Sequence, residues 1–170
     1  QTGGNNSAFG YGALSASTVS DNNAFGAFAL HNNTTGLNNT GFGHRAMISN
    51  TTGAGNTAVG HRAGHNTTTG TNNTCIGIDA GFAVTTGSNQ ILIGHDAGTG
   101  NSPAGEQTTG GDTVCLGDNN IASFFCADTS ISSSDARDKT DVTSFNIGLT
   151  WINALRPVTY RWDRRTWYGT

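Results

Sequence analysis

An apolar residue followed by glycine recurs along the first two thirds of the chain at a nearly constant spacing. We call these the key glycines, and they lie 16, 17, 17, 17, 17 and 23 residues apart: Gly10, Gly26, Gly43, Gly60, Gly77, Gly94 and Gly117. Three further marks keep the same period. They are an Asn four residues before the key glycine, an Ala three residues after it, and a Thr-Thr-Gly triplet between copies. A unit of this length is too short for a pair of helices and fits one coil of a solenoid. The repeat therefore predicts a mainly β fold, a β-solenoid of the β-roll or β-helix kind.

Each coil is expected to contain a short strand such as 56–60, a bend, a second short strand around Ala63, and a Thr-Thr-Gly turn. Gly and Asn suit the turns because both tolerate left-handed backbone. We expect the residue before each key glycine to face the core, together with Ala58 and Ala63, because that position is apolar in every copy. Its occupants are Phe9, Phe25, Phe42, Val59, Ile76, Ile93 and Leu116.

The asparagine column is expected to form a ladder, because stacked coils place identical residues about 4.8 Å apart. Its members are Asn6, Asn22, Asn39, Asn56 and Asn73. Cys75 and Cys115 stand two residues before a key glycine, where other copies have alanine, so we expect small buried core residues there. The 23-residue step is interpreted as one coil with a surface insertion at 98–106 that contains Pro103.

Composition supports a repetitive β architecture and excludes several functional classes. Gly, Thr and Asn supply 70 of the 170 residues, whereas apolar residues make up 34% and charged residues 11%. The net charge of −3 gives no basic excess for nucleic acid, and we expect no membrane insertion because no run approaches about 20 apolar residues. The three cysteines lack a Cys-x-x-Cys motif, so neither a disulfide framework nor a zinc site is indicated.

The core of a single coil is expected to be thin. Its few inward apolar side chains, at about 25 cal/mol per Å², hardly offset the ordering of a whole coil at about 1–2 kcal/mol per residue. Three chains wrapped about one axis would share a core and cover one another's edges. We therefore expect a homotrimer, and we expect no cofactor.

Charge and aromatic content change near residue 127. Residues 1–127 hold two basic side chains, whereas the remainder holds six, together with all three tryptophans and the only lysine. We assign 1–127 to the solenoid shaft, 128–133 to a Ser-rich linker and 134–170 to a small α+β segment.

The segment 134–170 predicts one helix followed by one strand. The helix is expected to end before Pro157, and its apolar face consists of Val142, Phe145, Leu149 and Ile152. The strand is predicted from the alternation of Val158, Tyr160 and Trp162.

The pattern Asn-x-Ala-apolar-Gly-x-x-Ala over residues 3–120 resembles the trimeric β-roll repeats of bacterial adhesin heads and related repeats of phage fibres. The hexapeptide from Ser134 to Lys139 resembles the Ser-Asp-x-Arg-x-Lys signature of another family. That signature opens the intramolecular chaperone domain of endosialidase-type phage tail spikes, a family classed as autocleaving serine peptidases. Residues 155–162 are similar to the Leu-x-Pro-Val-x-Tyr-x-Trp stretch of the same family, and 134–168 resembles fibre proteins of phages infecting cyanobacteria.

The resemblance implies a Ser/Lys dyad and a single self-cleavage event. Ser134 would be the nucleophile and Lys139 the base that takes its proton, while Asp135 or Arg137 would orient the dyad or stabilise the oxyanion. The chain departs from the family at Asp138, where an apolar residue is usual, and it covers about the first third of such a domain. The alternative is a polar linker in which Lys139 is an ordinary surface charge.

Two further columns are candidates for ligand chemistry. His44, His61 and His95 each follow a key glycine, so a threefold assembly would form rings able to bind a metal or an anion, with ordinary packing as the alternative. Asp79 and Asp96 occupy successive coils about 5 Å apart, a carboxylate spacing found in retaining glycosidases. Arg62 stands in the same column one coil earlier, so a salt bridge with Asp79 is the simpler interpretation.

The sequence as a whole predicts a structural virion fibre, made in the host cytoplasm and carried on the particle surface. Its partners would be two further copies of the chain, other fibre or baseplate proteins, and a host glycan or protein. Three alternatives stay open: a bacterial trimeric adhesin head, a glycan-binding or glycan-degrading solenoid spike, and an ice-binding solenoid suggested by the Thr-Thr-Gly column.

Overall fold

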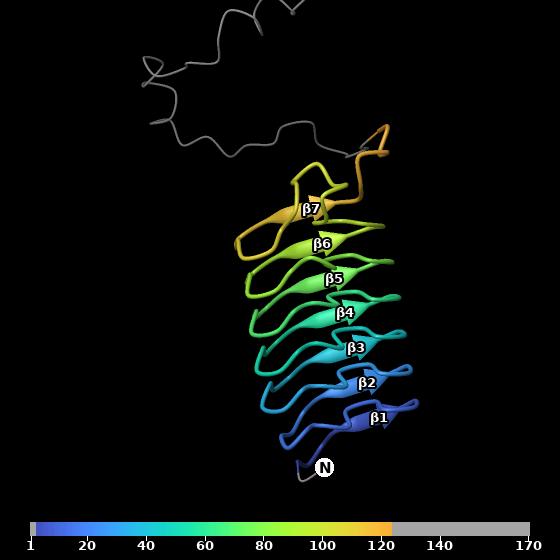
Figure 1. The fold of residues 1–170 in the computed structure, drawn as a ribbon, viewed down its shortest axis with the longest axis vertical. Helices are drawn as coiled ribbons and strands as arrows, with labels where there is room; N and C mark the ends of the chain where they lie inside the picture. Colours follow the sequence, from blue (N-terminus) through green and yellow to red (C-terminus); the bar gives the residue numbers. More distant parts are fainter. Residues whose placement is uncertain (1–2, 124–170) are drawn as a thin grey trace, which may run out of the picture. The chain divides into compact units, whose positions relative to one another are not determined.

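The computed structural model describes residues 3–123, which form a stack of coils with one three-residue strand in each coil (Figure 1). The seven strands pair in parallel, in the order of the sequence. They are β1 (Ser7–Phe9), β2 (Asn23–Phe25), β3 (Thr40–Phe42), β4 (Thr57–Val59), β5 (Thr74–Ile76), β6 (Ile91–Ile93) and β7 (Val114–Leu116). Residues 3–123 contain no helix. The prediction of a β-solenoid with coils of about 17 residues is confirmed.

Neighbouring coils are in register along most of their length. Each strand residue pairs with its own column in the next coil, as Ala58 does with Cys75. The same pairing continues in the turns, where the amide of Met47 donates to the carbonyl of Ala63 at 2.9 Å and that of Thr51 to Thr68 at 2.9 Å. The stack is therefore bonded from coil to coil outside the sheet as well as within it.

The asparagine ladder is confirmed. The backbone amide of Asn39 donates to Asn22 Oδ1 at 2.9 Å, and Asn39 Nδ2 donates to the carbonyl of Gly53 at 2.8 Å. The amide of Asn56 continues the ladder by donating to Asn39 Oδ1 at 3.0 Å. These side chains are fully buried, so each coil satisfies a buried amide with the backbone of its neighbours.

The prediction that the residue before each key glycine faces the core is wrong. Phe9 is 75% exposed, Phe42 56% and Val59 36%, and the other members of this column are also exposed. The residue two before the key glycine is buried instead, as Ala58 is, in every strand from β2 to β7. Adjacent residues of a strand point to opposite faces, so only one of the two columns can enter the core.

The predicted second strand around Ala63 is also wrong, although Ala63 is fully buried as expected. The chain between β4 and the next turn has left-handed backbone at two nearby positions, Arg62 with φ 55° and Gly64 with φ 59°. Alternating right- and left-handed residues curl the chain into turns and prevent an extended strand.

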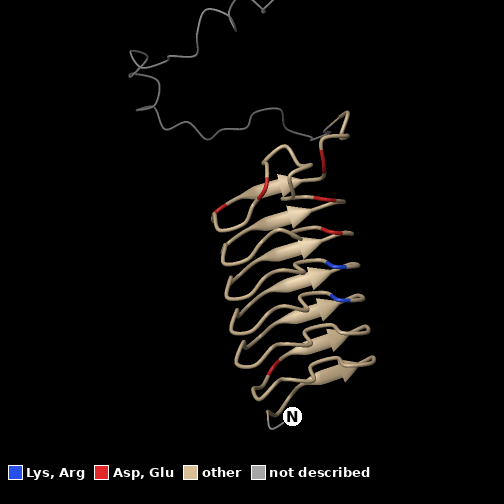
Figure 2. Cartoon of the chain, in the orientation of Figure 1, with Lys and Arg blue, Asp and Glu red and all other residues tan. Residues whose placement is uncertain are grey.

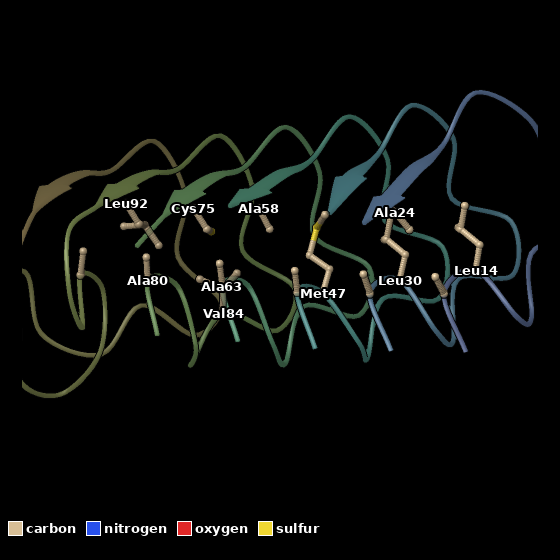
Figure 3. Packing of buried hydrophobic residues seen from close by; sticks show 14 of the residues in the cluster. Leu14, Ala24, Leu30, Met47, Ala58, Ala63, Cys75, Ala80, Val84 and Leu92 are labelled. Atoms are coloured by element: carbon tan, nitrogen blue, oxygen red, sulfur yellow. The ribbon is translucent and has the colours of Figure 1, made fainter. Parts of the chain in front are cut away.

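The core runs along the inside of the coils, where side chains from the strands face side chains from the turns (Figure 3). The coils of β1 to β6 each contribute the alanine three residues after the key glycine. In the first coils the largest side chain comes from the turn, four residues after the key glycine: Leu14, Leu30 and Met47. In later coils that position is glycine, and the strand supplies the larger residues Cys75 and Leu92.

The regular stack ends just after β7. The amide of Asp96 donates to Ile78 one coil earlier, but the amide of Asn119 in the same column donates to Asn101 of the insertion at 2.8 Å. Pro103 is exposed, as predicted for a surface insertion, whereas Ser102 is buried. The insertion thus occupies a place that the regular coil-to-coil bonding would otherwise use.

Several predictions fall outside the described residues: the boundary after 127, the linker at 128–133, the helix from 142 to 152 and the strand at 158–162. Residues 3–123 belong to one of two units, Gln1–Phe124. Within the described part of the chain, no helix is long and apolar enough to cross a membrane.

Candidate functional site

Among residues 3–123, the exposed large apolar side chains gather mainly on the outward side of the parallel sheet, which we call the outer sheet face. Strand alternation places two columns there, the residues one and three before each key glycine. The first column is apolar in all seven strands, from Phe9 to Leu116, and each of these side chains is at least 36% exposed. An apolar surface of this extent indicates an interaction site.

The outer sheet face changes in character along the stack. Strands β1 to β3 present phenylalanines, two of which, Phe25 and Phe42, pack with ring centroids 5.7 Å apart. Strands β4 to β7 present aliphatic residues at the same position. The second column is polar through β5 and turns apolar in the last two strands, where Ile91 is 42% and Val114 65% exposed. The apolar face is therefore one column wide over most of its length and two columns wide at β6 and β7.

The histidine column borders the outer sheet face. The rings of His44 and His61 stack with centroids 5.4 Å apart and an 11° angle between planes. His95 lies two coils beyond His61, with Ile78 between them. Among residues 3–123, no group of three or more His, Cys, Asp or Glu side chains is placed to hold a metal. A metal or anion ring would need histidines from other chains, so it stays a prediction.

The His95 ring faces Asp118, with Nδ1 3.4 Å from Oδ2. The pKa of Asp118 is lowered mainly because the side-chain and backbone amides of Asn120 donate to its carboxylate, at 2.9 and 3.0 Å. This carboxylate, whose side chain is only 16% exposed, is thus held ionised beside the last histidine of the column.

The charged column carries the predicted ion pair. Figure 2 shows basic residues on the turns after β3 and β4 and acidic residues on the turns that follow. Arg62 Nη2 lies 2.5 Å from Asp79 Oδ2, which confirms that the two side chains form a salt bridge. The Arg62 guanidinium also lies 5.0 Å from the ring centroid of Phe82, on which His65 stacks at 4.9 Å. Because Asp79 is bound by Arg62, the geometry favours an ion pair over a glycosidase acid pair with Asp96.

The Thr-Thr-Gly column is divided between two roles. The first threonine of the first four triplets donates its hydroxyl to the next coil, as Thr34 Oγ1 does to the carbonyl of Thr51 at 3.0 Å. The second threonine is exposed in every triplet: Thr35, Thr52, Thr69, Thr86 and Thr109. Only one of the two threonine columns therefore presents its hydroxyls fully to solvent.

The two described cysteines are buried, as predicted for core residues. Burial raises the pKa of the Cys75 thiol to about 12. A thiol that stays protonated at neutral pH is a poor nucleophile and a poor metal ligand. Cys75 therefore acts in packing.

Ser134, Asp135, Arg137 and Lys139 lie outside the described residues, so the geometry of the predicted dyad stays a prediction. Their sequence is nevertheless decisive for the comparison with known proteins. Residues 134–168 match the family model described as chaperone of endosialidase. The matched stretch contains all four residues and extends through the tyrosine- and tryptophan-containing segment that follows them. No curated protein and no solved structure matches the chain.

Proposed function

We propose that this chain is a structural fibre protein of a phage particle, in which three copies form a solenoid shaft. The proposal rests above all on the match of residues 134–168 to the endosialidase chaperone family. The stack of coils supports it, because a solenoid bonded from coil to coil gives a stiff spacer of uniform cross-section. The shaft would be carried on the virion surface, joined to other fibre or baseplate proteins, and would contribute to host attachment.

A C-terminal chaperone suits the folding problem that this shaft presents. Each coil is closed by contacts between residues 17 positions apart, and the strands all pair in parallel. Such non-local pairing forms slowly, and a partly folded stack of coils exposes unpaired strand edges. Residues from 134 onward would hold three chains in register while the shaft forms. An adhesin head would share the repeat but leaves the match at 134–168 without a role.

Sedimentation equilibrium tests the assembly. Three chains of 17.5 kDa are expected to give a species of about 52 kDa. A monodisperse 17.5 kDa species at micromolar concentration would contradict the trimeric fibre.

The same proposal includes one self-cleavage at Ser134. The Lys139 amine would take the hydroxyl proton of Ser134, whose oxygen would attack a neighbouring peptide carbonyl. The peptide C–N bond would break as the lysine passes that proton to the leaving amine, and water would then hydrolyse the ester. In the natural full-length protein, mass spectrometry is expected to find a new terminus at or beside Ser134. Ser134→Ala should abolish it and Lys139→Ala should slow it severely, whereas Ser133→Ala is the matched control. A wild-type protein that stays intact through assembly would restrict this segment to a chaperone role.

A further inference from the structure

We infer that the outer sheet face is the surface along which parallel, in-register copies of this chain meet. The inference rests on the proposed trimer and adds to it the face and the orientation of the chains. The face consists of the column before each key glycine, widened at β6 and β7 by Ile91 and Val114.

Periodicity identifies a second copy as the occupant. The face repeats one apolar side chain at every coil over seven successive coils. A partner that covers all seven must carry apolar groups with the same axial spacing, and another copy of this solenoid does so at each level. Elsewhere on the coil the large exposed apolar side chains Tyr11, Leu37 and Ile78 do not recur at every coil, and other exposed columns, such as the second threonine of each Thr-Thr-Gly triplet, are polar. A lateral partner with the same repeat therefore buries this face and leaves the polar columns in water.

The sequence gradient along the face favours parallel chains. The column three before the key glycine begins with Ser7 and Asn23 and ends with Ile91 and Val114. Antiparallel copies would set Val114 opposite Ser7, and Ile91 opposite Asn23, burying polar side chains against aliphatic ones. Parallel copies in register place phenylalanine beside phenylalanine in β1 to β3 and aliphatic beside aliphatic in β4 to β7.

Cysteine cross-linking tests the face with matched variants. Ile93→Cys lies on the outer sheet face, and Thr86→Cys is an exposed position in the turn before β6. Both are made in the full chain with Cys126 replaced by serine, and both are treated with a short bis-maleimide. Ile93→Cys is expected to give covalent two-chain products at least tenfold more efficiently than Thr86→Cys. Equal or stronger cross-linking at Thr86→Cys would overturn the inference.

Mixed chains test the orientation. Ser7→Cys chains are co-folded with Val114→Cys chains and cross-linked. We expect products that join two Ser7→Cys chains or two Val114→Cys chains, and no product that joins one of each. A Ser7–Val114 product as abundant as the like products would indicate antiparallel chains and overturn the inference.

Sedimentation of the same samples separates this inference from the proposed function. A trimer that cross-links through Thr86→Cys and not through Ile93→Cys would reject the face and leave the fibre standing. A wild-type monomer would overturn both. Ile93→Asp is expected to shift the mass from about 52 kDa toward 17.5 kDa. A stable trimer of Ile93→Asp would again overturn the inference.

Discussion

The first and the last coils of the shaft fill the same core in opposite ways. In the first coils the turn supplies the large side chain, and the strand supplies Ala24 or Gly41. In the later coils the turn has glycine, and the strand enlarges to Cys75 and Leu92. A large strand residue excludes a side chain at the turn position, because a Cβ on Gly98 would lie only 2.8 Å from Leu92 Cδ1. The large core side chain therefore comes from the turn in the first coils and from the strand in the coils of β5 and β6, while the coil of β4 has the small residues Ala58 and Gly64 at both positions.

The two arrangements differ in backbone strain. The turn position has left-handed backbone throughout, with φ 50° at Leu30, 48° at Met47 and 65° at Gly81. Left-handed backbone costs a leucine or methionine about 1–2 kcal/mol and costs glycine almost nothing. The later coils are thus built with less strain, and their strands carry the packing instead.

Leu92→Ala is expected to have the largest effect on this comparison. Leu92 is fully buried, and the turns beside it contain Gly81 and Gly98, which have no side chain to fill the space. We expect a loss of about 4 kcal/mol in the free energy of unfolding. Urea unfolding at a fixed chain concentration measures it, with Thr86→Ala as the exposed control. A loss below about 1 kcal/mol would show that the strand does not carry the later core.

Asn56→Ala tests the asparagine ladder, which the first and the later coils share. The variant leaves the amide of Asn73 and the carbonyl of Gly70 without their partners inside the ladder. Each buried unpaired group costs about 1–3 kcal/mol, so we expect a loss of about 3 kcal/mol. Thr52→Ala, at an exposed position in the turn that precedes Asn56, is the control. If the two variants unfold alike, the ladder contributes nothing to the stack.

Gly98→Ala sharpens the steric argument. The added methyl group meets Leu92 Cδ1, and φ at this position is 77°, so we expect a loss of about 2 kcal/mol. In the double variant with Leu92→Ala the clash is removed, and the combined loss should fall short of the sum by about 1 kcal/mol. Strict additivity in the double-mutant cycle would contradict the exchange of volume between strand and turn.

The smallest expected effect is a pH dependence confined to the later coils. The pKa of the Cys75 thiol is raised from 9.0 to about 12, so above pH 9 the unfolded chain loses a proton that the folded chain keeps. The folded state then binds more protons, and its stability falls as pH rises from 9, by about 1.4 kcal/mol per pH unit. Between pH 8 and pH 10, wild type should lose about 1 kcal/mol more than Cys75→Ala. Parallel pH profiles would contradict this assignment.

The sequence predicts the period, the ladder and the burial of the cysteines because each depends on a column that the repeat keeps. The outward direction of Phe9 and its column was not predicted, because this column and the one before it are both rich in small or apolar residues. The alternation of side chains along a strand supplies the missing signal. Because Asn56 is buried, Ala58 two positions later also faces inward, and Val59 faces outward. The prediction of a second strand around Ala63 was wrong for a different reason: Arg62 has left-handed backbone, which its residue type does not indicate.

Oxidative footprinting of the assembled protein tests the central claim, that copies of the chain cover the outer sheet face. Hydroxyl radicals label exposed rings, and mass spectrometry reports the labelling of Phe25, Phe42 and Phe82. In wild type we expect Phe25 and Phe42 to be protected, although both are exposed in a single chain. In Ile76→Asp, which places a charge in the middle of the face, both should be labelled strongly while Phe82, at a turn, is unchanged. Equal labelling of Phe25 and Phe42 in wild type and Ile76→Asp would contradict the account.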